Sequence, residues 1–298
     1  MKKKEISTNS IIKHLCAIEK EEKLNEKESQ NYATDILINQ KKSIIIHLIH
    51  SIFKKESTKN QISESLHIIK LFYILDPKNT KLRVDQVIIK EDFANNLLNF
   101  FFNLSNEEIM LYEDIFFILF QIYPKLNNEA LNKNIINKFF NSLDLINEES
   151  NFSSLFYILM NINNLKQKEF FLIRSQHENY RIIDEYALKE LNKTKNENDM
   201  LKILFYIYVI IADKSKCNLY RNDIEILIDE LLYLMDDNGN KDIQIFVINV
   251  ILEIISNEVF HLHKVEEIRN LFNNIIESDE YDNVKDLCKK GINIINKN

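Results

Sequence analysis

The chain has 298 residues and a formal net charge of -7, with 45% hydrophobic and 28% charged residues, the balance of a water-soluble globular protein. This charge disfavours nucleic acid as a partner, because affinity for nucleic acid depends on basic residues that neutralise phosphates. Only two glycines and two prolines are present, so the tight turns that join strands are scarce and helices joined by short polar turns are favoured.

Apolar residues recur every three or four positions from the first part of the chain onward, which is the spacing of one face of a helix. The first segment of this kind covers residues 36–53 and the second covers residues 62–75. The Asp76–Pro77 pair predicts the end of the second helix, because a residue before proline is pushed out of helical backbone geometry. A third helix is predicted over residues 93–104.

The next helix begins with a recognisable cap. Ser105 is followed three residues later by Glu108, the spacing of a capping box, and the predicted helix continues to Pro124. No later segment alternates with the period of a strand. Further helices are predicted over residues 127–142, 150–163, 166–175, 178–192, 198–213, 222–236, 241–257, 262–277 and 280–296.

About a dozen helices of similar length, joined by short turns, favour an all-α solenoid of the armadillo or HEAT type. Such repeats contain about 40–47 residues, so about six or seven would fit in this chain. Stacked repeats need only contacts between neighbours, whereas a dozen helices are difficult to organise around one core. No linker divides the chain, so we expect one repeat domain over residues 1–298, with residues 1–30 as an N-terminal extension whose order the sequence leaves open.

The acidity is concentrated near the C-terminus. Residues 214–280 contain 14 acidic and 6 basic side chains. A protein with a basic face is the partner that such a surface favours.

The cysteines and the termini indicate the compartment. Cys16, Cys217 and Cys288 are far apart and odd in number, which favours a reducing environment over a disulfide framework. The lysines at positions 2–4 are followed by polar residues, which argues against a signal peptide. The longest apolar run, residues 203–212, is about half of what a membrane span needs. We therefore predict a cytoplasmic protein with no membrane span.

Candidate metal and catalytic sites are few. His47 and His50 lie on an apolar helix without a nearby cysteine or carboxylate, so we interpret them as packed or boundary residues. His261 and His263 precede Glu266 and Glu267 but fall on different sides of a helix start. The acidic run at residues 236–242 is interpreted as a helix-ending turn, because it lacks the ligand order of a calcium loop.

Catalytic signatures are also absent from the sequence. It contains no GxSxG motif, no HExxH motif and no glycine-rich phosphate loop. We expect no catalytic residue, no metal and no cofactor.

One stretch, residues 220–232, carries a more specific pattern. In it, Asn222 is predicted to be the N-cap of a helix, with Glu225 three residues later and Asp223 complementing the positive end of the helix dipole. The aliphatic residues that follow are expected to face inward: Ile224, Leu227, Ile228, Leu231 and Leu232.

The same stretch resembles the most recognisable segment of the WISH/DIP/SPIN family. In that family a helix leads to an aromatic residue, then Asn-Asp, then an aliphatic run that ends in Leu-Ile-Asp. A later turn contains Asn, an aromatic residue and Lys, followed by a helix with an acidic start. The matching positions here are Tyr220, Asn222, Asp223, Leu227, Ile228 and Asp229, and then Asn257, Phe260, Lys264, Glu266, Glu267 and Ile268.

The resemblance implies an armadillo-repeat activator of the actin-related-protein two/three complex, the actin nucleator of the cytoplasm. Members of that family favour the active arrangement of the complex without a pre-existing filament, so the product is a linear filament. The resemblance also implies a location at the actin-rich cortex. Animal members carry an SH3 domain and proline-rich segments, which the present sequence lacks, so the match concerns the armadillo region alone.

Candidate partner-binding residues are the polar positions predicted to be exposed in the acidic last third of the chain. They are Arg221, Glu225, Asp229, Lys264 and Arg269. Two other hypotheses remain open at this point. One is a generic armadillo or HEAT adaptor unrelated to actin, and the other is a helical enzyme. The oligomeric state is not indicated by the sequence.

Overall fold

The structure of the protein is a computed structural model. The structure describes residues 45–75, 93–123, 131–178, 180–213, 219–237, 240–257, 263–278 and 282–297. The predictions for residues 1–30, the Asp76–Pro77 turn, Pro124 and Gly239 lie outside the described residues.

All regular structure in the described residues is helical, which confirms the predicted all-α solenoid class. The chain divides into two compact units, residues 1–158 and 159–298, and the boundary falls within one helix. The expected single domain stays a prediction, as does the number of repeats.

The helices of the first unit follow the predicted segments closely. Residues 45–53 are helical, and the elements that follow are α3 (Lys59–Leu75), α5 (Phe93–Asn103), α6 (Asn106–Leu111), α7 (Asp114–Ile122), α8 (Lys133–Asn141), the short 3-10 helix η2 (Leu143–Leu145) and the first part of α9 (Glu149–Leu165).

The single helix predicted between Ser105 and Pro124 is wrong, because two helices occupy this stretch. The capping box at Ser105 and Glu108 is present as predicted. However, α6 ends at Leu111, with Tyr112 as the C-cap residue whose N–H donates to the Glu108 and Ile109 carbonyls, and α7 begins at Asp114. The break lets Tyr112 be buried together with Ile109 of α6 and Ile115 of α7, so tertiary packing decides the boundary.

A buried lysine joins three elements of the first unit. The Lys70 Nζ of α3 lies 2.8 Å from Asp114 Oδ1, 2.7 Å from Glu148 Oε1 and 3.2 Å from Asn151 Oδ1. On its other oxygen, Asp114 is 2.9 Å from His67 Nδ1. A buried ammonium needs such partners, since its desolvation is otherwise costly. Burial opposes ionisation of Asp114, but the bonds from His67 and Lys70 outweigh it and lower the pKa of Asp114 to about 2.

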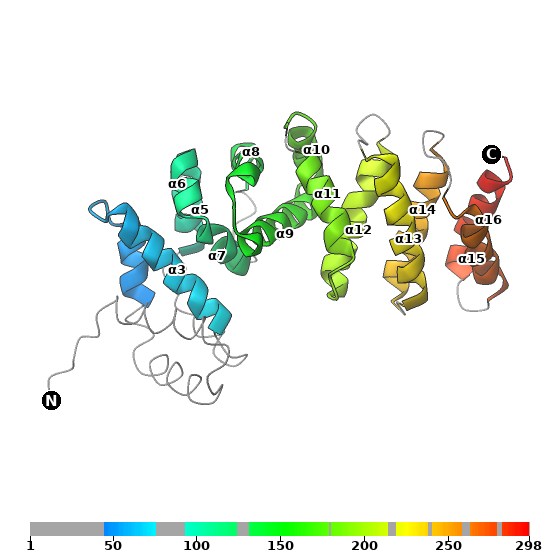
Figure 1. Cartoon of the computed structure of the whole chain (residues 1–298), viewed down its shortest axis with the longest axis horizontal. Coiled ribbons are helices and arrows are strands. Elements are labelled where there is room, and N and C mark those ends of the chain that lie inside the picture. The colour runs from blue at the N-terminus through cyan, green and yellow to red at the C-terminus, as the bar shows by residue number, and fades with distance from the viewer. Residues whose placement is uncertain are drawn as a thin grey trace. The chain divides into compact units, whose positions relative to one another are not determined.

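The second unit is built from helical hairpins. Its elements are the rest of α9, α10 (Gln167–Arg174), α11 (Tyr180–Leu191), α12 (Glu197–Ala212), α13 (Arg221–Asp237), α14 (Lys241–Ile255), α15 (Val265–Glu277) and α16 (Asp282–Ile295). The pairs α11/α12, α13/α14 and α15/α16 each pack together, and their second helices α12, α14 and α16 pack on one another in order (Figure 1). This neighbour-to-neighbour stacking is the packing of a helical-repeat protein.

The position of α14 explains its composition. It contacts α12, α13 and α16, and eight of its residues are buried. A helix covered on several sides must be apolar on several sides, which is the pattern of residues 241–255. By contrast, α13 packs against α14 and α11 and leaves Ile226 and Tyr233 exposed to solvent.

A buried polar cluster fixes the start of the second unit. The Arg174 guanidinium donates to both carboxylate oxygens of Asp184 and, over 3.0 Å, to the hydroxyl of Tyr206. All three side chains are almost completely inaccessible to solvent. Burial raises the pKa of Asp184, while the adjacent guanidinium favours its charged form. Each charged or polar group has a partner, as buried ion pairs require.

In the part of the chain that the structure describes, no helix is both long enough and apolar enough to cross a membrane.

Replacing Asp114 by asparagine should destabilise the protein in a pH-dependent way. Because its pKa is lowered to about 2, ionised Asp114 stabilises the folded state above its unfolded pKa. This contribution, about 2 kcal/mol, is lost as the pH falls from about 4 to about 2. Urea unfolding of both proteins should therefore show a difference near neutrality that shrinks on acidification. A difference independent of pH would contradict this prediction.

Replacing Gly291 by alanine should also destabilise the protein. A Cβ atom at this position would overlap the ring of Phe272 and lie 3.0 Å from Leu252 Cδ2. Overpacking of this kind costs about 1–3 kcal/mol in unfolding free energy, although alanine is intrinsically the better helix former. The matched control is Asn293→Ala on the exposed side of α16, which should not destabilise. Equal stability of Gly291→Ala and wild type would show that α15 and α16 do not approach this closely.

Candidate protein-interaction surface

The start of α13 differs from the predicted cap. The helix begins at Arg221, and the Ile224 N–H donates to the Tyr220 carbonyl, so Tyr220 is the N-cap residue. The Tyr220 N–H donates to Asp223 Oδ2 over 2.9 Å. The predicted N-cap role of Asn222 is therefore wrong, because the helix starts earlier and Asn222 is an exposed residue of the first turn.

The predicted capping partner, Glu225, has another role. It accepts a hydrogen bond from Arg221 Nε over 2.8 Å, an ion pair between residues four positions apart on the helix surface. Arg221 is mostly exposed and the Glu225 side chain about one-third exposed. Both are therefore at the surface, as predicted for partner-binding candidates.

Tyr220 is held against α11. Its ring lies 4.1 Å from the Arg181 guanidinium carbon, and Arg181 also donates to the Tyr220 hydroxyl. More than half of the Tyr220 surface remains exposed. The side chain is thus both fixed and accessible, a combination that suits an interface anchor, since little conformational entropy is left to lose.

The inward side of α13 matches the sequence prediction. Ile224, Leu227, Ile228 and Leu231 are buried, and Leu232 is partly buried. Leu227 and Ile228, two positions of the family-like motif, therefore stabilise the fold and are not available to a partner.

The solvent side of α13 carries a row of residues spaced four and three positions apart, which we call the outer stripe: Asn222, Ile226, Asp229, Tyr233 and Asp236. Ile226 and Tyr233, two helical turns apart, are 55% and 58% exposed. Exposed bulky apolar residues in a row with carboxylates indicate an interaction site, whereas a helix side that carries only charged residues is common on any soluble protein. Sequence reasoning missed Ile226 because it lies within an aliphatic run.

Asp229 joins the outer stripe to the segment before α15. Its Oδ1 lies 2.9 Å from His263 Nε2 and 3.2 Å from Lys264 Nζ. Partial burial acts to raise the pKa of Asp229, but the contacts with His263 and Lys264 outweigh it and the net change is downward. The structure thus brings together Asp229 and Lys264, which are 35 positions apart.

Lys264 has an unusual backbone. Its φ is 52°, in the left-handed region that non-glycine residues rarely adopt. Its Nζ also lies 3.4 Å from Glu267 Oε2, so two carboxylates hold the side chain. Hydrogen bonds to Asp229 and Glu267 raise the pKa of Lys264.

The remaining partner-binding candidate, Arg269, and the remaining motif positions are distributed differently. Arg269 is one-third exposed and pairs with Glu266 over 2.8 Å. Asn257 is buried, and Phe260 and His261 lie outside the described residues. The structure therefore associates Arg221 with Glu225 and Asp229 with Lys264, and it keeps Arg269 in its own pair on α15.

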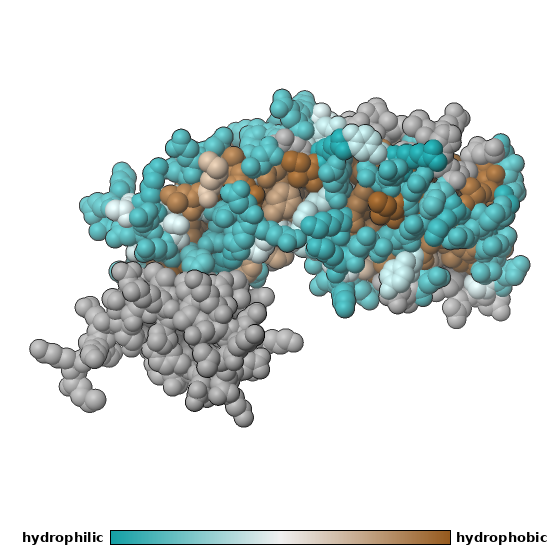
Figure 2. Space-filling view, in the orientation of Figure 1, coloured by the Kyte–Doolittle hydropathy of each residue, from teal (hydrophilic) through white to brown (hydrophobic). Residues whose placement is uncertain are grey.

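The surface of α13 is strongly acidic, since the helix has six acidic residues and one arginine. Hydrophilic residues cover most of the visible face of the second unit, with apolar residues in narrow areas between helices (Figure 2). This charge favours a basic partner surface.

Among the described residues, no group of three or more His, Cys, Asp or Glu side chains could hold a metal ion. His47 and His50 are exposed on the helix of residues 45–53, so they are not packed residues.

Comparison with known proteins identifies no family for this chain. No family model matches it, and no curated protein matches it. Among solved structures, it is similar to a designed armadillo repeat protein in complex with a (KR)4 peptide. The two share 13% sequence identity with a TM-score of 0.34, over 84% of this chain and 98% of that one.

Substitutions at Lys264 should distinguish the effect of its positive φ on stability from the effect of its side-chain ion pairs. Glycine and alanine both remove the two ion pairs, but only glycine adopts positive φ without steric cost. We expect Lys264→Gly to unfold at a higher temperature than Lys264→Ala in calorimetry. At Lys241, the first residue of α14, the order should be reversed, because alanine is the better helix former. Equal unfolding temperatures for the two Lys264 variants would contradict the strained backbone.

Proposed function

We propose that this chain is a non-enzymatic protein-binding repeat protein and that the outer stripe of α13, with Tyr220 and the Asp229–Lys264 pair, contacts its partner. We further propose that this partner is the actin-related-protein two/three complex, which the chain activates to nucleate linear filaments. The site of action would then be the actin-rich cortex of the cytoplasm.

The observation that carries the proposal is the contact between Asp229 and Lys264. Asp229 ends the first of the two separate segments that resemble the WISH/DIP/SPIN family, and Lys264 lies within the second. The pair brings charged residues from both segments together at the surface of the second unit. Their pairing beside the exposed Tyr233 and Ile226 supports a shared interaction role.

Activation by binding requires a preference for one state of the partner. A ligand shifts an equilibrium only by its difference in affinity for the two states. A fixed surface suits this task, since Tyr220 is stacked on Arg181 and Asp229 is held by His263 and Lys264. The chain would stabilise the active arrangement of the complex without any chemical step of its own.

A generic adaptor for a different basic partner is the second candidate. It is favoured by the acidity of α13 together with the exposure of Ile226 and Tyr233, neither of which depends on the family resemblance. An affinity purification that recovers a kinase or transport receptor, and no actin-related protein, would support this candidate.

Purified protein should accelerate pyrene-actin assembly in the presence of the actin-related-protein two/three complex, and imaging should show unbranched filaments. Asp229→Lys should reduce the acceleration about tenfold, because it reverses a contact charge and repels Lys264. Glu169→Lys, the same reversal at an exposed position of α10, is the matched control and should remain active. No acceleration by the wild-type protein would refute the actin function.

If acceleration is present but survives charge reversal at each of the five candidates, the contact surface lies elsewhere. The five are Arg221, Glu225, Asp229, Lys264 and Arg269. An Ile226→Glu variant extends the test to the apolar part of the outer stripe, and it changes no buried residue.

A further inference from the structure

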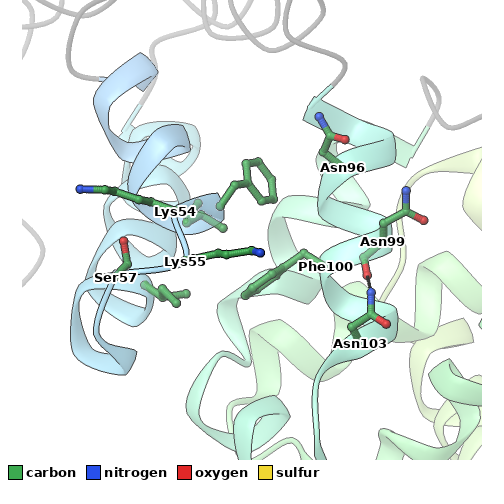
Figure 3. Close-up of a pocket in the computed structure, with 10 residues that line it drawn as sticks. Lys54, Lys55, Ser57, Asn96, Asn99, Phe100 and Asn103 are labelled. Atoms are coloured by element: carbon green, nitrogen blue, oxygen red, sulfur yellow. Dashed lines mark hydrogen bonds between the residues drawn. The ribbon is translucent and has the colours of Figure 1, made fainter.

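A pocket in the first unit is far in sequence from α13 and belongs to no part of the proposed function. It has a volume of about 520 Å³, within the range of ligand sites. It lies between residues 52–62 on one side and α5 on the other (Figure 3). The lining residues are Ile52, Phe53, Lys54, Lys55, Ser57, Ile62, Asn96, Asn99, Phe100 and Asn103.

The apolar part of the pocket is an aromatic row. The rings of Phe53 and Phe100 are 6.1 Å apart and meet edge to face. Phe53 also contacts Phe93 at 5.9 Å, and Phe100 contacts Tyr112 at 6.1 Å. Because each ring is held by neighbours, the pocket can accept a bulky apolar side chain without first becoming ordered.

The charge of the pocket is positive. Two lysines line it and no acidic residue does. The Lys54 Nζ is paired with Glu56 over 2.8 Å, whereas Lys55 forms no ion pair with any residue that the structure describes. Figure 3 shows Lys55 extending toward Phe100 across the space between the two walls, with Lys54 pointing away. Lys55 therefore offers its ammonium to a carboxylate at the edge of an aromatic surface.

The opposite wall is rich in amides. Asn96, Asn99 and Asn103 line the pocket from α5, a helix without a charged residue. A side-chain amide can both donate and accept, as a peptide group does. Asn103 Nδ2 already donates to the Asn99 backbone carbonyl over 2.8 Å, which fixes this side chain and leaves its oxygen as an acceptor. Asn99 and Asn103 are separated by about 6 Å along the helix axis, close to the two-residue repeat of an extended chain, about 6.6 Å. This spacing suits an extended peptide backbone.

Local bonds hold the turn that forms the first wall. The Ser57 N–H donates to the Lys54 carbonyl over 3.0 Å. The Thr58 N–H donates to Gln61 Oε1 over 2.9 Å, and the Gln61 N–H donates to Thr58 Oγ1 over 3.3 Å. These two bonds between Thr58 and Gln61 occupy backbone N–H groups at the start of α3. A phosphate bound at a helix N-terminus needs such N–H groups to be free, so this helix start does not favour a phosphate. A peptide carboxylate on Lys55 is the better match.

We propose that this pocket binds an extended peptide segment of a partner protein, with a bulky apolar side chain on Phe53 and Phe100 and a neighbouring acidic side chain on Lys55. The proposal is independent of α13 and of actin.

A fluorescein-labelled peptide, Ser-Phe-Asp-Phe-Asp-Phe-Ser, tests it by anisotropy with the full chain. We expect saturable binding with Kd below about 1 mM, weakened by salt. Lys55→Glu should raise Kd at least about tenfold, and replacing both aspartates of the peptide by asparagine should do the same. Lys133→Glu, an exposed reversal on α8, is the matched control and should leave Kd unchanged.

Two results would overturn the proposal. One is the absence of an anisotropy change when the labelled peptide is titrated with the wild-type chain up to about 1 mM. The other is binding that Lys55→Glu or the uncharged peptide leaves intact. Circular dichroism of each variant verifies folding, and Lys55 is exposed, so the substitution disturbs no core contact. Actin assembly by Lys55→Glu should equal that of wild type, which separates this test from that of α13.

Discussion

Each helix in this protein can bury its apolar face only against a neighbouring helix, and this constraint determines both its stability and where it can bind. An amphipathic helix gains its stability from tertiary packing more than from its own propensity. In the second unit α14 is covered by α12, α13 and α16, and its composition is accordingly apolar on several sides. The first helix of a hairpin, such as α13, keeps an uncovered side. Function is therefore expected on such helices.

The two polar clusters of the interior serve this packing in different ways. Lys70 ties α3 to α7 and to the start of α9, and Arg174 ties α10 to α11 and α12. A buried charge is tolerated only where its partners are correctly positioned, so each cluster fixes the register of the helices that it joins. The surface pair of Asp229 and Lys264 differs, because water reaches it and its contribution to stability is small. A solvent-accessible pair beside exposed Ile226 and Tyr233 contributes little to folding and suits a role in recognition.

Periodicity and capping chemistry predicted most of the fold because both are local. The helices at residues 93–103 and 241–255 follow from spacing, and the Ser105–Glu108 capping box from two residues three positions apart. The break between α6 and α7 was missed, because it depends on burying Tyr112 against distant residues. The Arg174 cluster was missed for the same reason, since its members come from three helices and share no sequence motif.

Less of the candidate surface could be predicted. The choice of Asp229 and Lys264 relied on resemblance, whereas their contact depends on how the residue before α15 meets α13 and could not be inferred from spacing. Asn222 was assigned a cap because asparagine favours that position, yet Asp223 captures the Tyr220 N–H and moves the cap to Tyr220. Which of two neighbouring side chains accepts from a given backbone N–H depends on their positions in the folded chain and not on the average capping preference of the residue type.

The outer stripe and the pocket illustrate why a helical-repeat protein can bind more than one partner. The stripe is acidic with exposed Ile226 and Tyr233, whereas the pocket is lined by lysines, amides and aromatic rings. Opposite charges select opposite partners, so a peptide that fits Lys55 is repelled by α13, and a basic surface that fits α13 gains nothing from the pocket. Because repeat packing needs only neighbour contacts, the surface residues of each unit are constrained separately, and the two chemistries can coexist in one chain.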